Sequence, residues 1–64
     1  MSTYRVMVEN SRTAKSRAFN TLSSALEHAQ SVVLSDRHAR AEVFNGKRLR
    51  FRYWYDDGLQ YLEY

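Results

Sequence analysis

The stretch that decides the fold runs from residue 39 to residue 55 and reads ARAEVFNGKRLRFRYWY. In both halves, apolar and polar side chains alternate with a period of two, which is typical of strands with one buried face. Between the halves stands Asn45-Gly46, a pair that favours tight turns because both residues tolerate a left-handed backbone. The stretch therefore predicts a β-hairpin.

The length of the loop decides which side chains share a face. A two-residue loop at Asn45-Gly46 would pair Val43 with Arg48 and so bury a charge. A three-residue loop, with Gly46 in the left-handed position of a bulged turn, instead keeps Val43 on the same face as Leu49 and Phe51. We predict the three-residue loop, which sets Glu42 opposite one of the arginines of the second strand.

A second turn is predicted at residues 56–58, Asp-Asp-Gly, and a returning strand follows it to residue 64. A two-residue loop there would turn Leu62 and Tyr64 inward, and a three-residue loop would turn Leu59 and Tyr61 inward. Both sets of side chains are apolar, so the sequence permits either loop length.

Before the hairpin, residues 3–9 alternate as a half-buried strand, and residues 10–17 form a polar, basic loop or exposed hairpin. Residues 14–19 could form a short edge strand. An N-cap is expected at Asn20 or Thr21. The apolar residues that follow lie on one helical stripe: Leu22, Ala25, Leu26, Ala29, Val32 and Val33. The predicted helix is about 13 residues long.

These elements predict a single α+β domain over residues 1–64. One amphipathic helix packs on an antiparallel sheet of four strands, or five if residues 14–19 pair. The expected order is strand, optional strand, helix, strand, strand, strand, with the helix covering the face of Val43, Phe51 and Tyr53.

The composition limits the class of protein. The 64 residues include no cysteine, eight arginines, two lysines and nine aromatic residues, with a net charge of +3. No secretion signal or long apolar run occurs, so we expect a cytoplasmic protein without a membrane partner. The arginine bias favours a charged or nucleic-acid partner.

A row of arginines is the most informative candidate site. Arg48, Arg50 and Arg52 stand two residues apart on one predicted strand, so their side chains would leave one face roughly 6.6 Å apart. Trp54 continues the row, and Arg40 on the neighbouring strand would widen it. Such a row can follow a sugar-phosphate backbone and stack a base; it can equally be a solvated face or meet an acidic protein.

The loop adds three further cations, Arg12, Lys15 and Arg17, beside hydroxyl side chains of the kind that contact phosphate. An ordinary mobile loop explains the same residues. Trp54 and Tyr61, with Arg52, could instead anchor a protein partner. The last strand, if it is an unpaired edge, could pair two copies into a homodimer.

Catalytic and metal-binding patterns are weak in this sequence. His28 and His38 are ten residues apart and are expected to be exposed, and Asp56-Asp57 is explained by its turn. No phosphate loop or nucleophile motif occurs. We expect neither an enzyme nor a bound metal or cofactor.

In layout, the chain resembles small single-domain proteins of phages and mobile elements, among them anti-CRISPR proteins with strand, helix, strand, strand order. The resemblance matches no motif residue by residue. It implies a stoichiometric inhibitor that occupies a site on a nucleoprotein complex, although many such inhibitors are acidic and this chain is basic. The leading hypothesis is a non-enzymatic module whose arginine face contacts nucleic acid or a nucleoprotein; the alternative is a phage-type inhibitor or adaptor that binds protein.

Overall fold

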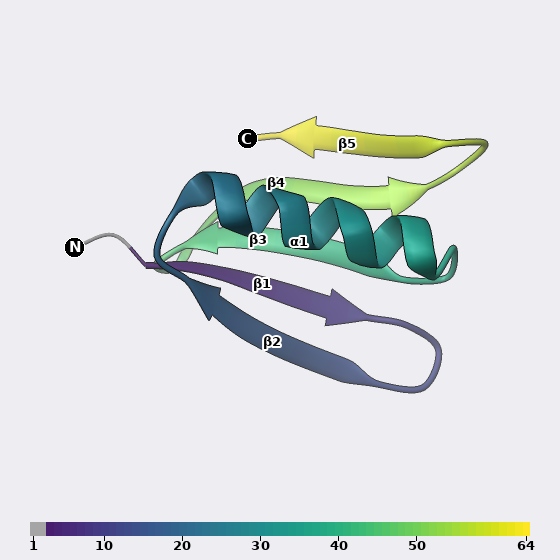
Figure 1. The fold of residues 1–64 in the computed structure, drawn as a ribbon, viewed down its shortest axis with the longest axis horizontal. Coiled ribbons are helices and arrows are strands. Elements are labelled where there is room, and N and C mark those ends of the chain that lie inside the picture. Colours follow the sequence, from purple (N-terminus) through teal and green to yellow (C-terminus); the bar gives the residue numbers. More distant parts are fainter. Residues whose placement is uncertain (1–2) are drawn as a thin grey trace.

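The computed structural model describes residues 3–64, which form one helix and a five-stranded sheet (Figure 1). The elements in chain order are β1 Tyr4–Glu9, β2 Ala14–Phe19, α1 Leu22–Ser35, β3 Arg40–Asn45, β4 Arg48–Tyr55 and β5 Leu59–Glu63. The strands pair antiparallel in the order β2-β1-β3-β4-β5. The predicted α+β fold is confirmed, and residues 14–19 supply its fifth strand.

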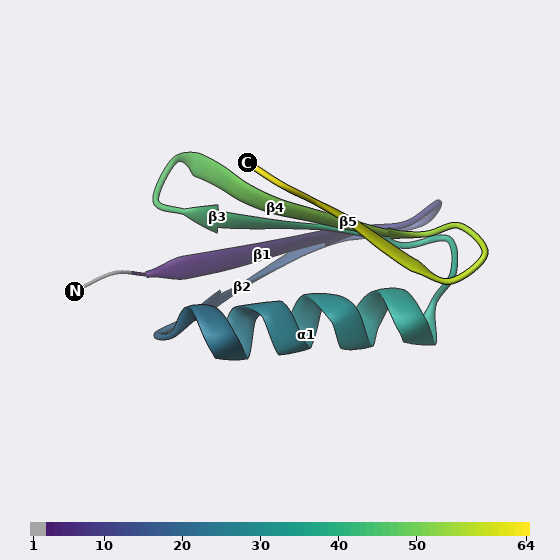
Figure 2. The ribbon, with the colours of Figure 1, turned by 90° about the horizontal axis from the view of Figure 1, so that it is seen from above.

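The helix covers one side of the sheet, which we call the helix face, and no element of residues 3–64 covers the other side, the open face (Figure 2). Small side chains let the helix approach closely: Ala25, Ala29 and Val33 are fully buried. Opposite them lie Val6 of β1 and Val43 of β3, which are also fully buried. The core is therefore a single layer of side chains between α1 and the central strands.

Both ends of α1 are capped by groups of the residues next to the helix. At the start, the Thr21 hydroxyl accepts a hydrogen bond of 3.2 Å from the amide of Ser24, so Thr21 and not Asn20 is the N-cap. At the end, the amide of Asp36 donates to the carbonyl of Val32 at 2.9 Å. The helix has 14 residues, close to the predicted length.

The loop of the β3–β4 hairpin differs from the prediction. Asn45 pairs with Arg48, so the loop contains only Gly46 and Lys47, and the predicted three-residue loop is wrong. Gly46 does have the expected left-handed backbone, with φ at +64°. That conformation fits a tight two-residue hairpin turn.

The extra residue lies inside β4 instead of in the loop. Val43 pairs with Phe51 while the next residue, Phe44, pairs with Leu49, so Arg50 is the unmatched residue of a β-bulge. The observed register differs by two residues from the predicted one. Because an even shift preserves the faces, Phe51 still lies on the helix face, as predicted.

Between the bulge and the turn, however, the faces change. Leu49 lies opposite Phe44 on the open face, which corrects its predicted place beside Phe51, and Arg48 lies on the helix side opposite Asn45. Glu42 pairs with Arg52 and not with Arg48 or Arg50.

The turn between β4 and β5 has the longer of the two loops that the sequence allowed. Tyr55 pairs with Leu59, which leaves residues 56–58 as a three-residue loop. The amide of Asp56 closes it by donating to the carbonyl of Gly58 at 2.9 Å. Leu59 and Tyr61 consequently lie on the helix face, while Leu62 lies opposite Arg52 on the open face.

Candidate nucleic-acid interface

The predicted row of arginines is not assembled on one face. Arg52 extends over the open face, where its Nη2 lies 3.1 Å from Oε2 of Glu42 in the one ion pair found among residues 3–64. Arg50 occupies the bulge, and its Nε is buried without a hydrogen-bond partner in the described part of the chain. Arg48 lies on the helix side. The bulge interrupts the period-two alternation that the row required.

Carboxylates and cations lie side by side on the open face. A hollow of about 260 Å³ is lined by Arg40, Arg52, Trp54 and Leu62. The first three of these are predicted site residues, so part of the predicted site is assembled there without Arg48 and Arg50. A second hollow, of about 180 Å³, brings Glu9 and Glu42 beside the same two arginines. Carboxylates therefore alternate with the cations across this face.

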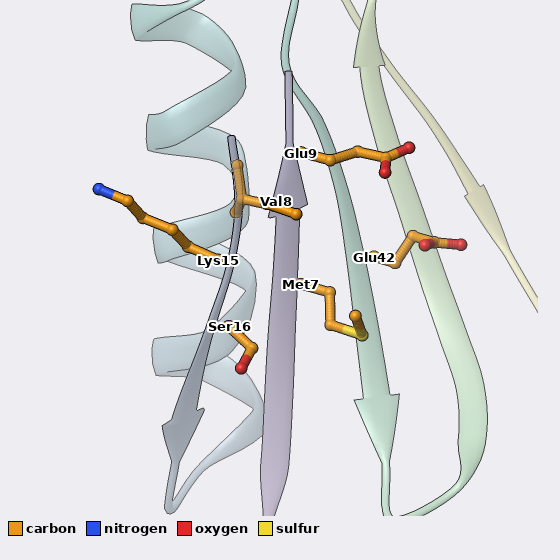
Figure 3. Close-up of a pocket in the computed structure, with 7 residues that line it drawn as sticks. Met7, Val8, Glu9, Lys15, Ser16 and Glu42 are labelled. Atoms are coloured by element: carbon orange, nitrogen blue, oxygen red, sulfur yellow. The ribbon is translucent and has the colours of Figure 1, made fainter. Parts of the chain in front are cut away.

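The acidic part of the open face continues toward β2. Figure 3 shows the side chains of Met7, Glu9 and Glu42 extending to the same side of the sheet, while Lys15 reaches the opposite way. Met7, which lies opposite Glu42 on the neighbouring strand, is 44% exposed. This arrangement disfavours a phosphate backbone running along the open face.

The two cations of β2, Lys15 and Arg17, lie on the helix face instead. A groove of about 400 Å³ lies between β2 and α1, and we call it the basic groove. Its floor is apolar, and its rim carries Lys15 and Arg17 from β2 and His28 from α1; the floor residues are Val6, Val8 and Val32. The groove is open because β2 is an edge strand on which only Phe19 is even partly buried.

Ring contacts hold one end of the basic groove. The guanidinium carbon of Arg17 lies 5.3 Å from the ring centroid of Phe19, and that ring lies 5.1 Å from the ring of His28. His28 is thus half-buried, which corrects its expected exposure, whereas His38 is exposed as predicted. The stack fixes the orientation of Arg17 at the rim.

The β1–β2 loop is held by its own hydrogen bonds. Oδ1 of Asn10 accepts from the amides of Arg12 and Thr13, each at 2.8 Å. The other end of the same side chain donates to Oδ2 of Asp36 at 3.0 Å, which ties the loop to the exit of α1. Arg12 is therefore presented from an organised turn next to the groove, which Asn10 and Thr13 also line.

The predicted pair of aromatic anchors is divided between two faces. Tyr61 stacks on Tyr53 on the helix face, with ring centroids 5.7 Å apart, and is 60% exposed. Trp54 lies on the open face opposite Gln60. One flat partner surface could not contact both side chains.

Sequence reasoning missed the apolar side chains of the open face and the place of His28. On the open face, Leu62 and Tyr64 are 49% and 50% exposed. The available signal was that β5 is apolar at both odd and even positions. Without the register, that signal does not say which set is covered by the helix.

Within residues 3–64, no three His, Cys, Asp or Glu side chains gather as a metal-ligand group, and no helix has the length and apolarity to cross a membrane. Comparison of the chain with protein-family models, with curated proteins and with solved structures gave no match.

Proposed function

We propose that this protein is a non-enzymatic module that binds nucleic acid through the basic groove between β2 and α1. The observation that carries the proposal is the distribution of charge. Arg52 on the open face is neutralised by Glu42, whereas Lys15 and Arg17 have no acidic partner among residues 3–64. The net charge of +3 adds a long-range attraction for a polyanion.

The spacing of the two rim cations suits a repeating anion. Lys15 and Arg17 are two residues apart on one strand, so their side chains leave the same side of β2 roughly 6.6 Å apart. Arg12 in the adjoining turn extends the cationic edge. Phosphate contacts from such side chains supply affinity without reading sequence.

The groove also offers a site for a base. Its floor of valine side chains and the ring of His28 form an apolar and aromatic surface beside the cations. Stacking of bases on such surfaces tolerates any sequence because every base has an aromatic face. Since α1 is packed along the sheet and is not free to enter a major groove, we expect little sequence preference.

The test is a titration of end-labelled single-stranded and duplex oligonucleotides, read by fluorescence anisotropy at low and at near-physiological salt. Trp54 provides a second signal because it is the only tryptophan and lies on the open face, away from the basic groove. We expect anisotropy to rise with little change in tryptophan emission. Quenching of Trp54 would contradict binding in the groove, and a flat anisotropy would contradict nucleic-acid binding altogether.

A matched pair of double variants locates the contacts. Lys15→Gln with Arg17→Gln removes both rim cations, and Lys47→Gln with Arg48→Gln removes the same charges from the β3–β4 hairpin, where both residues are exposed. The first variant should lower the slope of log affinity against log salt by about 1.4 for single strands, at about 0.7 per lost phosphate contact. The second should keep the wild-type slope; equal losses in both would mean that only net charge matters.

A further inference from the structure

We infer that the open face is the interface of a homodimer in which two sheets pack face to face around a two-fold axis. The inference is independent of nucleic-acid binding, because the basic groove lies on the other side of the sheet. It rests on the way acidic, basic and apolar side chains are ordered across the strands, and it names a second copy of this chain as the partner.

The central row of the open face is self-complementary. Crossing the sheet from β1 to β5, the register aligns Met7, Glu42, Arg52 and Leu62. The row thus reads apolar, acid, base, apolar. If the two-fold axis runs parallel to the strands between β3 and β4, each Glu42 faces the Arg52 of the second copy and each Met7 faces the second copy's Leu62.

The two neighbouring rows obey the same rule. On one side the register aligns Glu9 with Arg40 and Trp54 with Gln60. The axis then brings Arg40 against the Trp54 ring of the second copy, a cation–π contact, and Glu9 against its Gln60 amide. No like charges meet in this row.

On the other side, Phe44 is aligned with Arg5 of β1 and with Leu49 of β4. The axis sets Phe44 against Leu49 of the second copy. The bulge at Arg50 is what brings Leu49 to the open face, so the irregularity that broke the row of arginines also completes this apolar pair.

The exposed apolar area argues that this face is covered. Met7, Leu62 and Tyr64 are each between 44% and 50% exposed, and all three lie on the open face. Sheets that pack face to face lie about 10 Å apart. The ion pair of Glu42 and Arg52 would become a four-charge cluster that is neutral overall, which limits the cost of desolvating it.

The size of the face sets the strength of association. A standard interface buries about 800 Å² on each partner, about a sixth of the 4809 Å² surface of the chain. The four overlapping strands β1, β3, β4 and β5 have a flat footprint of roughly 19 by 20 Å, or about 380 Å², which is under half of that standard area and places this interface among the weak, transient ones. We therefore expect a dimer that dissociates on dilution.

Sedimentation equilibrium over a concentration series tests the inference with matched leucine variants. Leu62→Arg sets a charge at the outer end of the central row, where it faces Met7 of the second copy, and should weaken the dimer by more than about tenfold. Leu34→Arg changes a leucine of similar exposure, 57%, on α1 and should leave dimerisation unchanged. A chain that stays monomeric at all concentrations, or equal effects of both variants, would overturn the inference.

Charge exchange provides a second test that does not depend on Leu62. Glu42→Arg alone sets four cations together and should abolish the dimer, whereas Glu42→Arg combined with Arg52→Glu restores opposite charges both within and between chains and should recover it. Circular dichroism on each variant checks that the monomer remains folded. Failure of the folded double variant to recover the dimer would overturn the proposed pairing.

Edge-to-edge pairing through β5 is the competing arrangement. The amide of Tyr64 donates to β4, at the carbonyl of Arg50, so by alternation the amide of Glu63 points away from the sheet. Glu63→Pro removes this outward donor while sparing the β4–β5 ladder. The face-to-face dimer should survive the change; loss of the dimer in Glu63→Pro but not in Leu62→Arg would overturn the inference in favour of the edge.

Discussion

Single side chains connect distant parts of this small chain, and Asn10 is the clearest case. Its carboxamide organises the β1–β2 turn with its oxygen and reaches Asp36 at the end of α1 with its nitrogen. These two segments are 26 residues apart in the sequence. The contact therefore closes one end of the basic groove, which is otherwise bounded only by an edge strand and a helix.

Acid sensitivity follows from the same contact. The backbone amide of His38, and then the side chain of Asn10, donate hydrogen bonds that lower the pKa of Asp36 below its usual value. A carboxylate with a lowered pKa stabilises the fold above its ordinary pKa of about 4, and this contribution is lost as the pH falls through the folded value.

We therefore predict that the free energy of unfolding decreases below about pH 4 and that Asp36→Asn reduces this dependence. Urea unfolding measured between neutral and acidic pH tests it. Because Asp36 is only partly buried, the effect should be small and should shrink as salt is added. Parallel pH dependences in the wild type and the variant would contradict the assignment.

At the scale of elements, the seam between α1 and the sheet is made of small residues. Ala25 and Ala29 are fully buried because the helix axis lies close above Val6 and Val43, and a larger side chain would have to push the layers apart. This close approach lets one short helix cover the centre of a five-stranded sheet.

Ala29→Leu should consequently destabilise the protein by about 1–3 kcal/mol through overpacking. The control is Ser31→Leu, which adds the same side chain on the exposed side of the same helix and should change stability by less than about 0.5 kcal/mol. Thermal and urea unfolding of both variants measures the difference. If Ala29→Leu were as stable as the control, the seam would have more room than the buried surfaces indicate.

For the whole molecule, one layer of helix on one layer of sheet gives a shortest dimension of 17 Å and leaves the two sheet surfaces chemically distinct. The helix face carries the core and, at its β2 side, the basic groove. The open face carries paired charges with exposed apolar side chains. In the inferred dimer, β2 lies outside the overlap of β1, β3, β4 and β5, so each copy keeps an accessible groove.

The two proposals therefore predict separable behaviour. Monomeric Leu62→Arg should retain its affinity for nucleic acid, and the dependence of that affinity on salt, within about twofold. A small effect is expected because Leu62 lies far from the basic groove and shares no contact with it. The variant that lacks the cations of Lys15 and Arg17 should still dimerise. Native mass spectrometry should detect one oligonucleotide per chain in the dimer; loss of both activities in either variant would contradict the separation.

The sequence by itself determined the helix, the strands and most of the turns, because each depends on local periodicity and local backbone preference. The stripe from Leu22 to Val33 could face only a core, and Gly46 required a left-handed turn. Val43 and Phe51 were assigned to the correct face, although not to each other, because an even shift in register preserves facing.

Only the tertiary structure decided where the cations and exposed apolar groups meet. The bulge at Arg50 depends on pairing between two strands, and this one unmatched residue separated Arg48 from Arg52 and turned Leu49 to the open face. The groove that brings Lys15 to the same side as His28 depends on β2 pairing with β1 at the edge of the sheet. The periodicity of one strand determines that its side chains alternate between the two faces of the sheet. Long-range pairing of the strands determines which side chains of the neighbouring elements they contact.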